Sequence, residues 1–258
     1  MADGSLELPA GAGAAGRGGR AGAETQGAAP GRARRRIGSG YLALIVVVIA
    51  AVLGGGIGAG LALSRPSYGS YANLMGLSDM PSTPAPGFTL TDQHGRVMSL
   101  SSFRGRAVVL EFMDPHCTDI CPLVSQEFVD AYHDLGSSAR HVTFVAVNVN
   151  RYVEGQKAME SFSEAHGLSS IPSWHFFTGS TAALSAVWKD YGIYVHSPSP
   201  TADVIHSSYV FFIDPQGRER YLASPMADHR ANGSSYLPVS TLSAWGHGIA
   251  SYARRLES

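Results

Sequence analysis

Cysteine is scarce in this sequence, which has two thiols among its 258 residues, Cys117 and Cys121. The part of the chain that looks globular is about 170 residues long, which is enough to bury a core without the support of a disulfide. A purely structural cross-link is therefore the least favoured explanation of the pair. A redox pair and one part of a metal site remain as alternatives.

Large apolar side chains are nearly absent from residues 1–40, which are rich in Gly, Ala and Arg and end in a basic cluster at residues 32–36. Such a composition cannot bury enough apolar surface to offset the entropy of ordering the chain. We therefore expect residues 1–40 to form a disordered arm.

Charged side chains are absent from residues 41–63, YLALIVVVIAAVLGGGIGAGLAL. At 1.5 Å per residue, a helix over this segment would cross a hydrocarbon core of about 30 Å. A cleaved signal peptide has a shorter apolar stretch of about 7 to 15 residues, so we predict a retained transmembrane signal anchor rather than a buried core helix. The preceding arginines place residues 1–40 in the cytoplasm and the rest of the chain outside the cell membrane.

Basic stretches interleaved with aromatic residues are also lacking, which argues against a nucleic-acid partner. The formal net charge of the chain is −1. All ten histidines follow the predicted anchor, where acidic residues outnumber basic ones. An extracytoplasmic location would permit the two cysteines to be oxidised.

The remainder of the chain alternates between strand and helix patterns. Residues 64–87 hold four prolines and are predicted to be an extended tether. The elements predicted after it are a hairpin at 88–100, strands at 106–113, 141–148 and 173–178, helices at 123–135, 153–166 and 181–192, a second hairpin at 207–224 and a closing helix at 239–256. This order predicts an α/β thioredoxin-like fold for residues 88–258, with a central mixed sheet flanked by helices.

The stretch FMDPHCTDICP connects the strand at 106–113 to the following helix. If that helix begins near Thr118, Cys117 lies at its N-terminus, where unpaired backbone N–H groups stabilise a thiolate. Cys121 follows four residues later and would point to the same side of the first turn. Two thiolates in this position can form a disulfide or hold one soft metal ion.

The polar neighbours of these cysteines receive structural assignments. His116 would acidify Cys117 if it were protonated and close, but a solvated loop position is the favoured interpretation. Asp114 and Asp119 oppose thiolate formation, and we assign them to turn formation and to the start of the helix.

Two thiolates do not complete a copper site, because Cu(I) accepts two soft sulfurs together with an imidazole. In a thioredoxin arrangement, the loop that enters the first strand of the later hairpin approaches the cysteines. Here that loop reads DVIHSSYVFFID and places His206 at the strand entrance. Cys117, Cys121 and His206 are therefore the predicted metal ligands, whereas His175 is assigned to a strand and His196 to a proline-containing loop.

The motifs CTDICP, HSSYVFFIDPQG and WHFFTGSTAALSAVWKDYG resemble those of the SCO/SenC family over residues 86–225. This family consists of membrane-anchored, thioredoxin-like copper proteins. The resemblance implies binding of Cu(I) or Cu(II) by Cys117, Cys121 and His206. It also implies assistance in assembling the copper A site of cytochrome c oxidase, by copper delivery, thiol reduction or both, with an oxidase subunit as the copper-accepting partner.

The sequence departs from the family pattern around the predicted ligands. Residues 113–116 replace the usual aromatic-Thr/Ser-x approach to the first cysteine, and NVNRYVEG replaces an acidic Asp-Pro-Glu-x-Asp stretch. Ile205 stands where the family has an acid before its histidine, and Asp203 is the nearest acidic residue. These changes leave the three ligands in place but remove acidic groups around them.

Three functions from different classes remain. The first is a copper metallochaperone on the outer face of the cell membrane. The second is a metal-independent thiol–disulfide oxidoreductase, in which Cys117 attacks, Cys121 resolves the mixed disulfide and a thiol reductant donor is required. The third is a non-catalytic binding module with a structural disulfide. His206 is needed only by the first, which favours copper.

Overall fold

The computed structural model describes residues 68–257. The arm predicted for residues 1–40 and the membrane anchor predicted for residues 41–63 lie outside the described part of the chain. Within residues 68–257, no helix is both long enough and apolar enough to cross a membrane.

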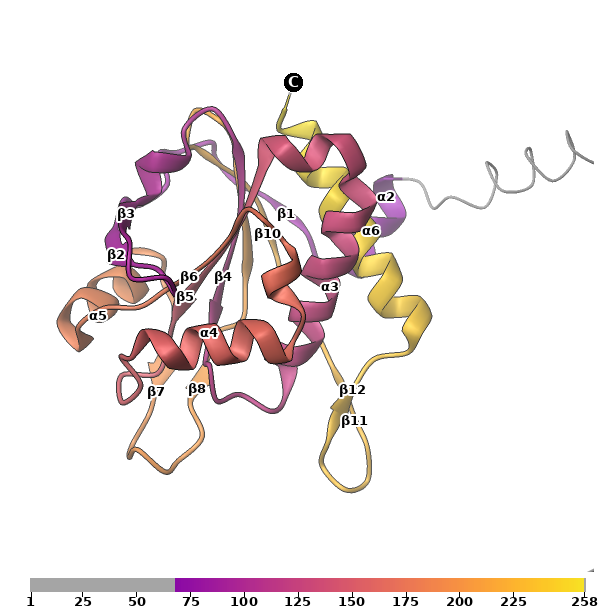
Figure 1. The fold of residues 1–258 in the computed structure, drawn as a ribbon. Helices are drawn as coiled ribbons and strands as arrows, with labels where there is room; N and C mark the ends of the chain where they lie inside the picture. The colour runs from indigo at the N-terminus through magenta and orange to yellow at the C-terminus, as the bar shows by residue number, and fades with distance from the viewer. Residues whose placement is uncertain (1–67, 258) are drawn as a thin grey trace, which may run out of the picture. The chain divides into compact units, whose positions relative to one another are not determined.

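A six-stranded mixed sheet forms the centre of the domain (Figure 1). In the order in which they neighbour one another, its strands are β1 (Ser78–Asp79), β10 (Glu219–Ala223), β9 (Val210–Ile213), β4 (Ala107–Met113), β5 (Val142–Asn148) and β6 (Trp174–Phe177). Strands β4, β5 and β6 are parallel, whereas β9 is antiparallel to β4 and β10. Every residue of β4 and β5 is buried, which explains their nearly continuous apolar sequences.

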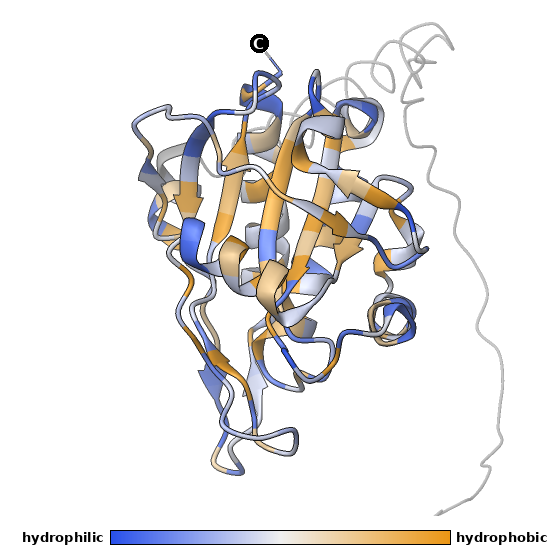
Figure 2. Cartoon of the chain, turned by 90° about the vertical axis from the view of Figure 1, so that its left-hand side faces the viewer, coloured by the Kyte–Doolittle hydropathy of each residue, from blue (hydrophilic) through white to orange (hydrophobic). Residues whose placement is uncertain are grey.

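Helices cover both faces of this sheet. They are α2 (Tyr68–Leu74), α3 (Ile120–Leu135), α4 (Gln156–Ala165), α5 (Thr181–Asp190) and α6 (Val239–Arg255), with 3-10 turns η1 (Leu100–Phe103), η2 (Gly136–His141) and η3 (Leu168–Ser170). Helices α2, α3, α4 and α6 pack on one face. Helix α5, η1 and the hairpin of β2 (Thr89–Thr91) and β3 (Val97–Ser99) pack on the other, which Figure 2 shows over the hydrophobic strands.

The connections between these elements are those of the thioredoxin fold. The unit β4–α3–β5 supplies two parallel neighbouring strands, and β9, β10 and α6 complete the sheet on the other side of β4. The pair α4 and β6 extends the sheet at one edge. The predicted α/β fold is confirmed, and it places the loop between β4 and α3 at the end of the central strand.

The extended tether predicted for residues 64–87 is wrong from Tyr68 onward. Helix α2 packs against α6, and β1 pairs with β10 at the edge of the sheet. Tyr71 and Met75 are buried in the core, and a β-carbon at Gly248 of α6 would collide with the Met75 sulfur. The folded domain therefore begins about twenty residues earlier than the predicted boundary at residue 88.

Several element boundaries also differ from the predictions. Helix α4 begins at Gln156 rather than at residue 153, after a loop that Asn148 holds through hydrogen bonds to the carbonyls of Asn150 and Val153. The segment predicted as a loop at 193–205 contains β7 (Val195–His196), which pairs with β8 (Ile205–His206). The ribbon of β11 (Asp228–His229) and β12 (Ser235–Tyr236) was not predicted.

Candidate functional site

The residues before Cys117 form a tight turn. The Cys117 N–H donates to the Asp114 carbonyl at 3.0 Å, and the His116 N–H donates to the Asp114 carboxylate at 2.9 Å. Asp at the first position and Pro at the second are the residues that such a turn favours. The Asp114-Pro115-His116 sequence thus forms the turn that reverses the chain direction between β4 and Cys117. This confirms the turn role assigned to Asp114.

A second loop fixes the same turn from the neighbouring strand. Asn150, just beyond β5, donates from its side-chain amide to the Asp114 carboxylate at 3.1 Å. Asn150 also accepts from the Tyr152 N–H, and its own N–H donates to the Asn148 side chain. Asn148 and Asn150 stand in the stretch where the family pattern has acidic residues. Their side-chain amides therefore form the hydrogen bonds that position the cysteine loop.

Helix α3 begins at Ile120, close to the start near Thr118 that was assumed for the cysteine argument. Cys117 therefore lies in the loop before the helix, because the Asp114 turn must be completed first. Cys121 lies in the first turn and is 2% exposed, whereas Cys117 is half-buried. Backbone N–H groups of Asp119 and Cys121 still reach the Cys117 sulfur, as expected for a helix start.

The two thiols are free, and they differ sharply in acidity. A hydrogen bond from the Cys121 thiol lowers the pKa of Cys117 to about 7, although burial and the Asp114 charge act in the opposite direction. The same hydrogen bond, together with burial, raises the pKa of Cys121. Cys117 is therefore the more accessible and more easily ionised thiol.

His206 ends β8 and is held in one tautomer. Its Nδ1 lies 2.9 Å from the Ser207 carbonyl oxygen, which can only accept, so Nδ1 carries the proton and Nε2 keeps its lone pair. Burial lowers the pKa of His206, against the opposing effects of the Ser207 carbonyl and the Asp114 charge. A neutral ring with a free Nε2 is the form of histidine that ligates metals.

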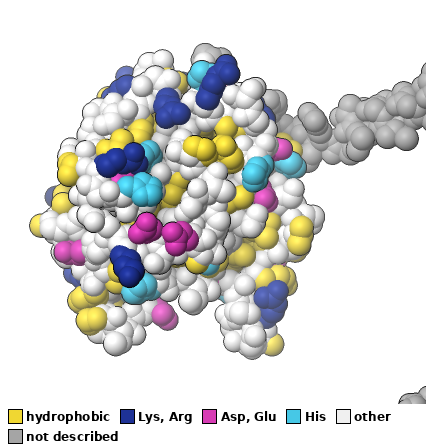
Figure 3. All heavy atoms as spheres, viewed as in Figure 1, with side chains coloured by type: hydrophobic (Ala, Val, Ile, Leu, Met, Phe, Trp, Pro, Cys, Tyr) yellow, Lys and Arg dark blue, Asp and Glu magenta, His cyan; other side chains and the backbone are white. Residues whose placement is uncertain are grey.

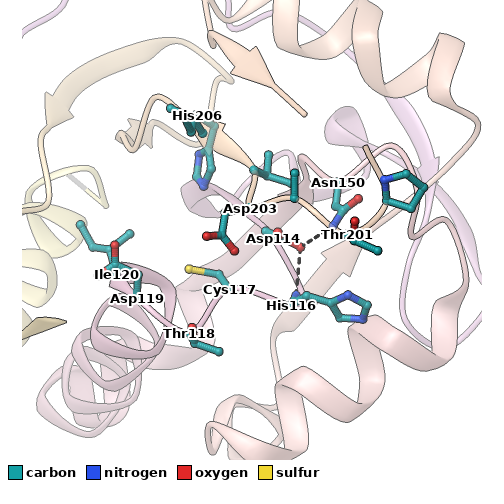
Figure 4. A pocket seen from close by; sticks show the side chains of 14 residues that line it. Asp114, His116, Cys117, Thr118, Asp119, Ile120, Asn150, Thr201, Asp203 and His206 are labelled. Carbon is teal, nitrogen blue, oxygen red and sulfur yellow. Dashed lines mark hydrogen bonds between the residues drawn. The ribbon is translucent and has the colours of Figure 1, made fainter. Parts of the chain in front are cut away.

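Cys117 and His206 line one cavity of about 510 Å³ from opposite sides (Figure 4). The cysteine wall, residues 114–120, supplies Cys117. The histidine wall, residues 194–206, of which residues 200–206 line the cavity, supplies His206. Cys121 lies behind Cys117 and contacts it through the thiol hydrogen bond. The fold thus places Cys117 and His206, which are about 90 positions apart in the sequence, on the same cavity.

The cavity is more open than a closed coordination shell. Among the described residues, no group of three or more His, Cys, Asp and Glu side chains is close enough to hold an ion. The His116 ring points away from the Cys117 sulfur in Figure 4 and is exposed, which agrees with its assignment to a solvated loop position. His175 lies in β6 as predicted, bonded to the buried Asp92 at 3.2 Å and outside the cavity lining.

Two buried carboxyl groups near the cysteines were not recognised from the sequence. Glu111 is 1% exposed in β4 and accepts from Ser208 Oγ at 2.8 Å, whereas the two oxygens of Glu127 in α3 have no hydrogen-bond partner among residues 68–257. Burial raises the pKa of both groups well above the usual range. One sequence signal could have revealed that Glu127 is buried. Its spacing from Val124 and Phe128 places it on the buried face of α3.

The model of the SCO1/SenC family matches residues 79–232, which is more than half of the chain. The chain belongs to the SCO1/SenC family. The matched range contains the cysteine wall and the histidine wall, and it extends beyond the resemblance noted over residues 86–225.

Relatives of this family member include proteins from bacteria and mitochondria. The SCO1 protein homolog of Bacillus subtilis is 26% identical over 133 residues, which cover 51% of this chain and 68% of the relative. The mitochondrial SCO2 homolog of Bos taurus is 28% identical over 138 residues, which cover half of each chain. This SCO1/SenC chain therefore matches about half of the length of its mitochondrial relative.

The fold of this SCO1/SenC member is also found among solved structures. The copper-bound structure of ScoI from Bradyrhizobium japonicum superposes with a TM-score of 0.53 at 20% identity, covering 67% of this chain and 99% of the other. At that identity the similarity concerns the fold alone. It agrees with the thioredoxin connections described above.

Proposed function

We propose that this protein is a copper metallochaperone whose ligands are Cys117, Cys121 and His206. The observation that carries the proposal is the shared cavity, which places the Cys117 thiol opposite the free Nε2 of His206 with Cys121 directly behind. Two sulfurs and an imidazole are a donor set that Cu(I) prefers. The copper-bound relative from Bradyrhizobium japonicum supports the choice of metal.

The order of events follows from the difference between the two thiols. Cys117 is accessible and ionises near neutral pH, so it would take up copper first, and Cys121 and His206 would then complete the coordination. Copper binding would displace the proton from the Cys121 thiol, because thiolates are the metal ligands. Release would reverse these steps by ligand exchange with an acceptor protein.

We infer that the acceptor is a subunit of cytochrome c oxidase and that delivery takes place outside the cell membrane. Membership in the SCO1/SenC family supports this acceptor, because the family resemblance implies assistance in assembling the copper A site of that oxidase. The apolar sequence at residues 41–63 supports a single N-terminal anchor with the thioredoxin-like domain on the outer face.

Copper titration of the reduced full-length protein tests the ligand set. In competition with a Cu(I) chelator, we expect one Cu(I) per chain, and we expect His206→Ala to weaken binding by about 100-fold, which corresponds to about 2.7 kcal/mol. His196→Ala is the matched control, since His196 lies on the paired strand but does not line the cavity. Equal affinity of the His206→Ala variant and the wild type would contradict the three-ligand proposal.

A second function, thiol–disulfide exchange, is favoured by the unequal thiols. Cys117 would attack a disulfide of the target protein and form a mixed disulfide. Cys121 would then displace the target thiol, which leaves the Cys117–Cys121 bond oxidised and requires an external thiol donor for the next cycle. This activity should survive in His206→Ala, whereas Cu(I) binding should not, so the same variant separates the two functions.

A further inference from the structure

Three carboxylates line the cavity, and they differ in whether they already have partners. Asp114 accepts from the His116 N–H and from the Asn150 amide, and Asp119 accepts from Ser235 Oγ. Asp203 forms no hydrogen bond or ion pair with any residue in 68–257. One exposed carboxylate is therefore available on the cavity surface.

Asp203 lines the same cavity as Cys117 and His206. It belongs to the histidine wall, three residues before His206, and its carboxylate points into the cavity between the His206 ring and the Cys117 sulfur in Figure 4. The segment before it contains Pro198 and Pro200 and makes a turn through the Ala202 N–H and the Ser199 carbonyl. Asp203 and His206 therefore belong to the same short segment of the histidine wall.

The two oxidation states of copper differ in the ligands they accept. Cu(I) is satisfied by the soft sulfurs and an imidazole, whereas Cu(II) favours tetragonal sites with nitrogen and oxygen donors. Cys117, Cys121 and His206 provide three donors and no oxygen. A carboxylate beside them would stabilise Cu(II) much more than Cu(I), because it is a hard, anionic ligand.

We propose that Asp203 is a fourth copper ligand, which coordinates Cu(II) but not Cu(I). The inference rests on the proposed copper function and goes beyond it by assigning an oxygen donor that selects the oxidation state. Asp203 thereby replaces, from a shifted position, the acidic residue whose place beside His206 is taken by Ile205. Its loss should raise the reduction potential of bound copper, since the oxidised form alone is weakened.

The test compares Asp203→Asn and Asp203→Ala with the wild type, each as the reduced full-length protein. Cu(I) affinity is measured by chelator competition, and Cu(II) is added anaerobically and followed by electron paramagnetic resonance. We expect both variants to lose at least about tenfold in Cu(II) affinity, which is about 59 mV in a one-electron couple, with Cu(I) affinity within about threefold of the wild type. The hyperfine splitting of the Cu(II) spectrum should change in parallel.

Asp190→Asn is the matched control, because it removes the same charge from an exposed position that does not line the cavity. An equal loss in Asp190→Asn would show a general charge effect and overturn the assignment. Unchanged Cu(II) affinity and spectrum in Asp203→Asn, or an equal loss for Cu(I) and Cu(II), would overturn it as well. If the wild type itself bound neither ion, the proposed copper function would fail, and the Asp203 assignment would fall with it.

Discussion

The two walls of the cavity are held in different ways. The cysteine wall follows the central strand, and hydrogen bonds from its own turn and from Asn150 converge on the buried Asp114 carboxylate. The histidine wall depends on the two-residue pairing of β7 with β8, and its Tyr194 and Ile205 side chains are each 62% exposed. In Figure 3 the β7–β8 and β11–β12 segments form two separate projections at the lower edge.

The difference between the two walls indicates how an open cavity could close around a metal ion. The cysteines are positioned before any ligand arrives, because the Asp114 turn and the start of α3 leave their backbone little freedom. The histidine wall is held by one two-residue strand pair, so we expect it to be the part that moves toward the sulfurs. We therefore infer that copper draws the histidine wall onto a preformed pair of thiols.

The largest expected effect concerns the two thiols within the cysteine wall. At pH 7 we expect iodoacetamide to modify Cys117 about 100-fold faster than Cys121, because only the thiolate reacts and Cys121 is buried with a raised pKa. The Cys117 pKa is depressed, so the rate should rise with pH through a midpoint near 7. Tandem mass spectrometry that locates the alkylated cysteine in the wild-type protein after increasing reaction times measures the two rates, and equal rates would contradict the described asymmetry.

The next effect compares one acidic residue from each wall. Asp114→Ala leaves the His116 N–H and the buried Asn150 amide without their acceptor, so the free energy of unfolding should fall by about 2 to 3 kcal/mol. Asp203→Ala removes an exposed carboxylate that has no partner among residues 68–257. It should change the free energy of unfolding of the metal-free protein by less than about 0.5 kcal/mol. Urea denaturation measures both values, and comparable losses would show that the walls are equally fixed.

A smaller effect is expected where the two walls are connected. Ser208, two residues after His206, donates to Glu111 on the strand that leads to the cysteine wall. Ser208→Ala should lower the free energy of unfolding by about 1 to 2 kcal/mol, because it leaves a buried carboxyl oxygen of Glu111 without its hydrogen-bond donor. The exposed Ser137 provides the control, and its replacement by alanine should be nearly neutral. A neutral Ser208→Ala variant would mean that the two walls are not coupled through Glu111.

The smallest effect is expected at the surface of the histidine wall. Ile205→Ser should alter the free energy of unfolding by less than about 0.5 kcal/mol, because most of this side chain is already in water. A buried counterpart, Ile213→Val in β9, should cost about 0.5 to 1.5 kcal/mol. Thermal denaturation compares the two, and a larger loss for Ile205→Ser would place this residue in an essential contact.

Much of the fold could be predicted because its signals are local. Buried parallel strands read as apolar runs, and the helix predicted at 181–192 corresponds to α5, whose N-terminus Ser180 caps by accepting from the Ala183 N–H. Helix α2 and strand β1 were missed because they are short and their few apolar residues lie among Ser, Gly and Pro. Their stability comes from packing on α6 and pairing with β10, which local sequence does not reveal.

For the candidate site, the sequence indicated which segments face each other but not the contacts within them. Cys117 and His206 share a cavity, as the thioredoxin order of elements suggested. The unequal acidities of the thiols and the buried Glu111 depend on contacts between distant segments, so no spacing in the sequence indicated them.

X-ray absorption spectroscopy of the full-length protein loaded with Cu(I) tests the central claim most directly. The account predicts two sulfur scatterers and one imidazole nitrogen around copper. In His206→Ala the nitrogen should disappear while both sulfurs remain, and in His196→Ala the spectrum should match the wild type. A wild-type spectrum without an imidazole nitrogen, or with fewer than two sulfurs, would contradict the assignment of Cys117, Cys121 and His206 as the copper ligands.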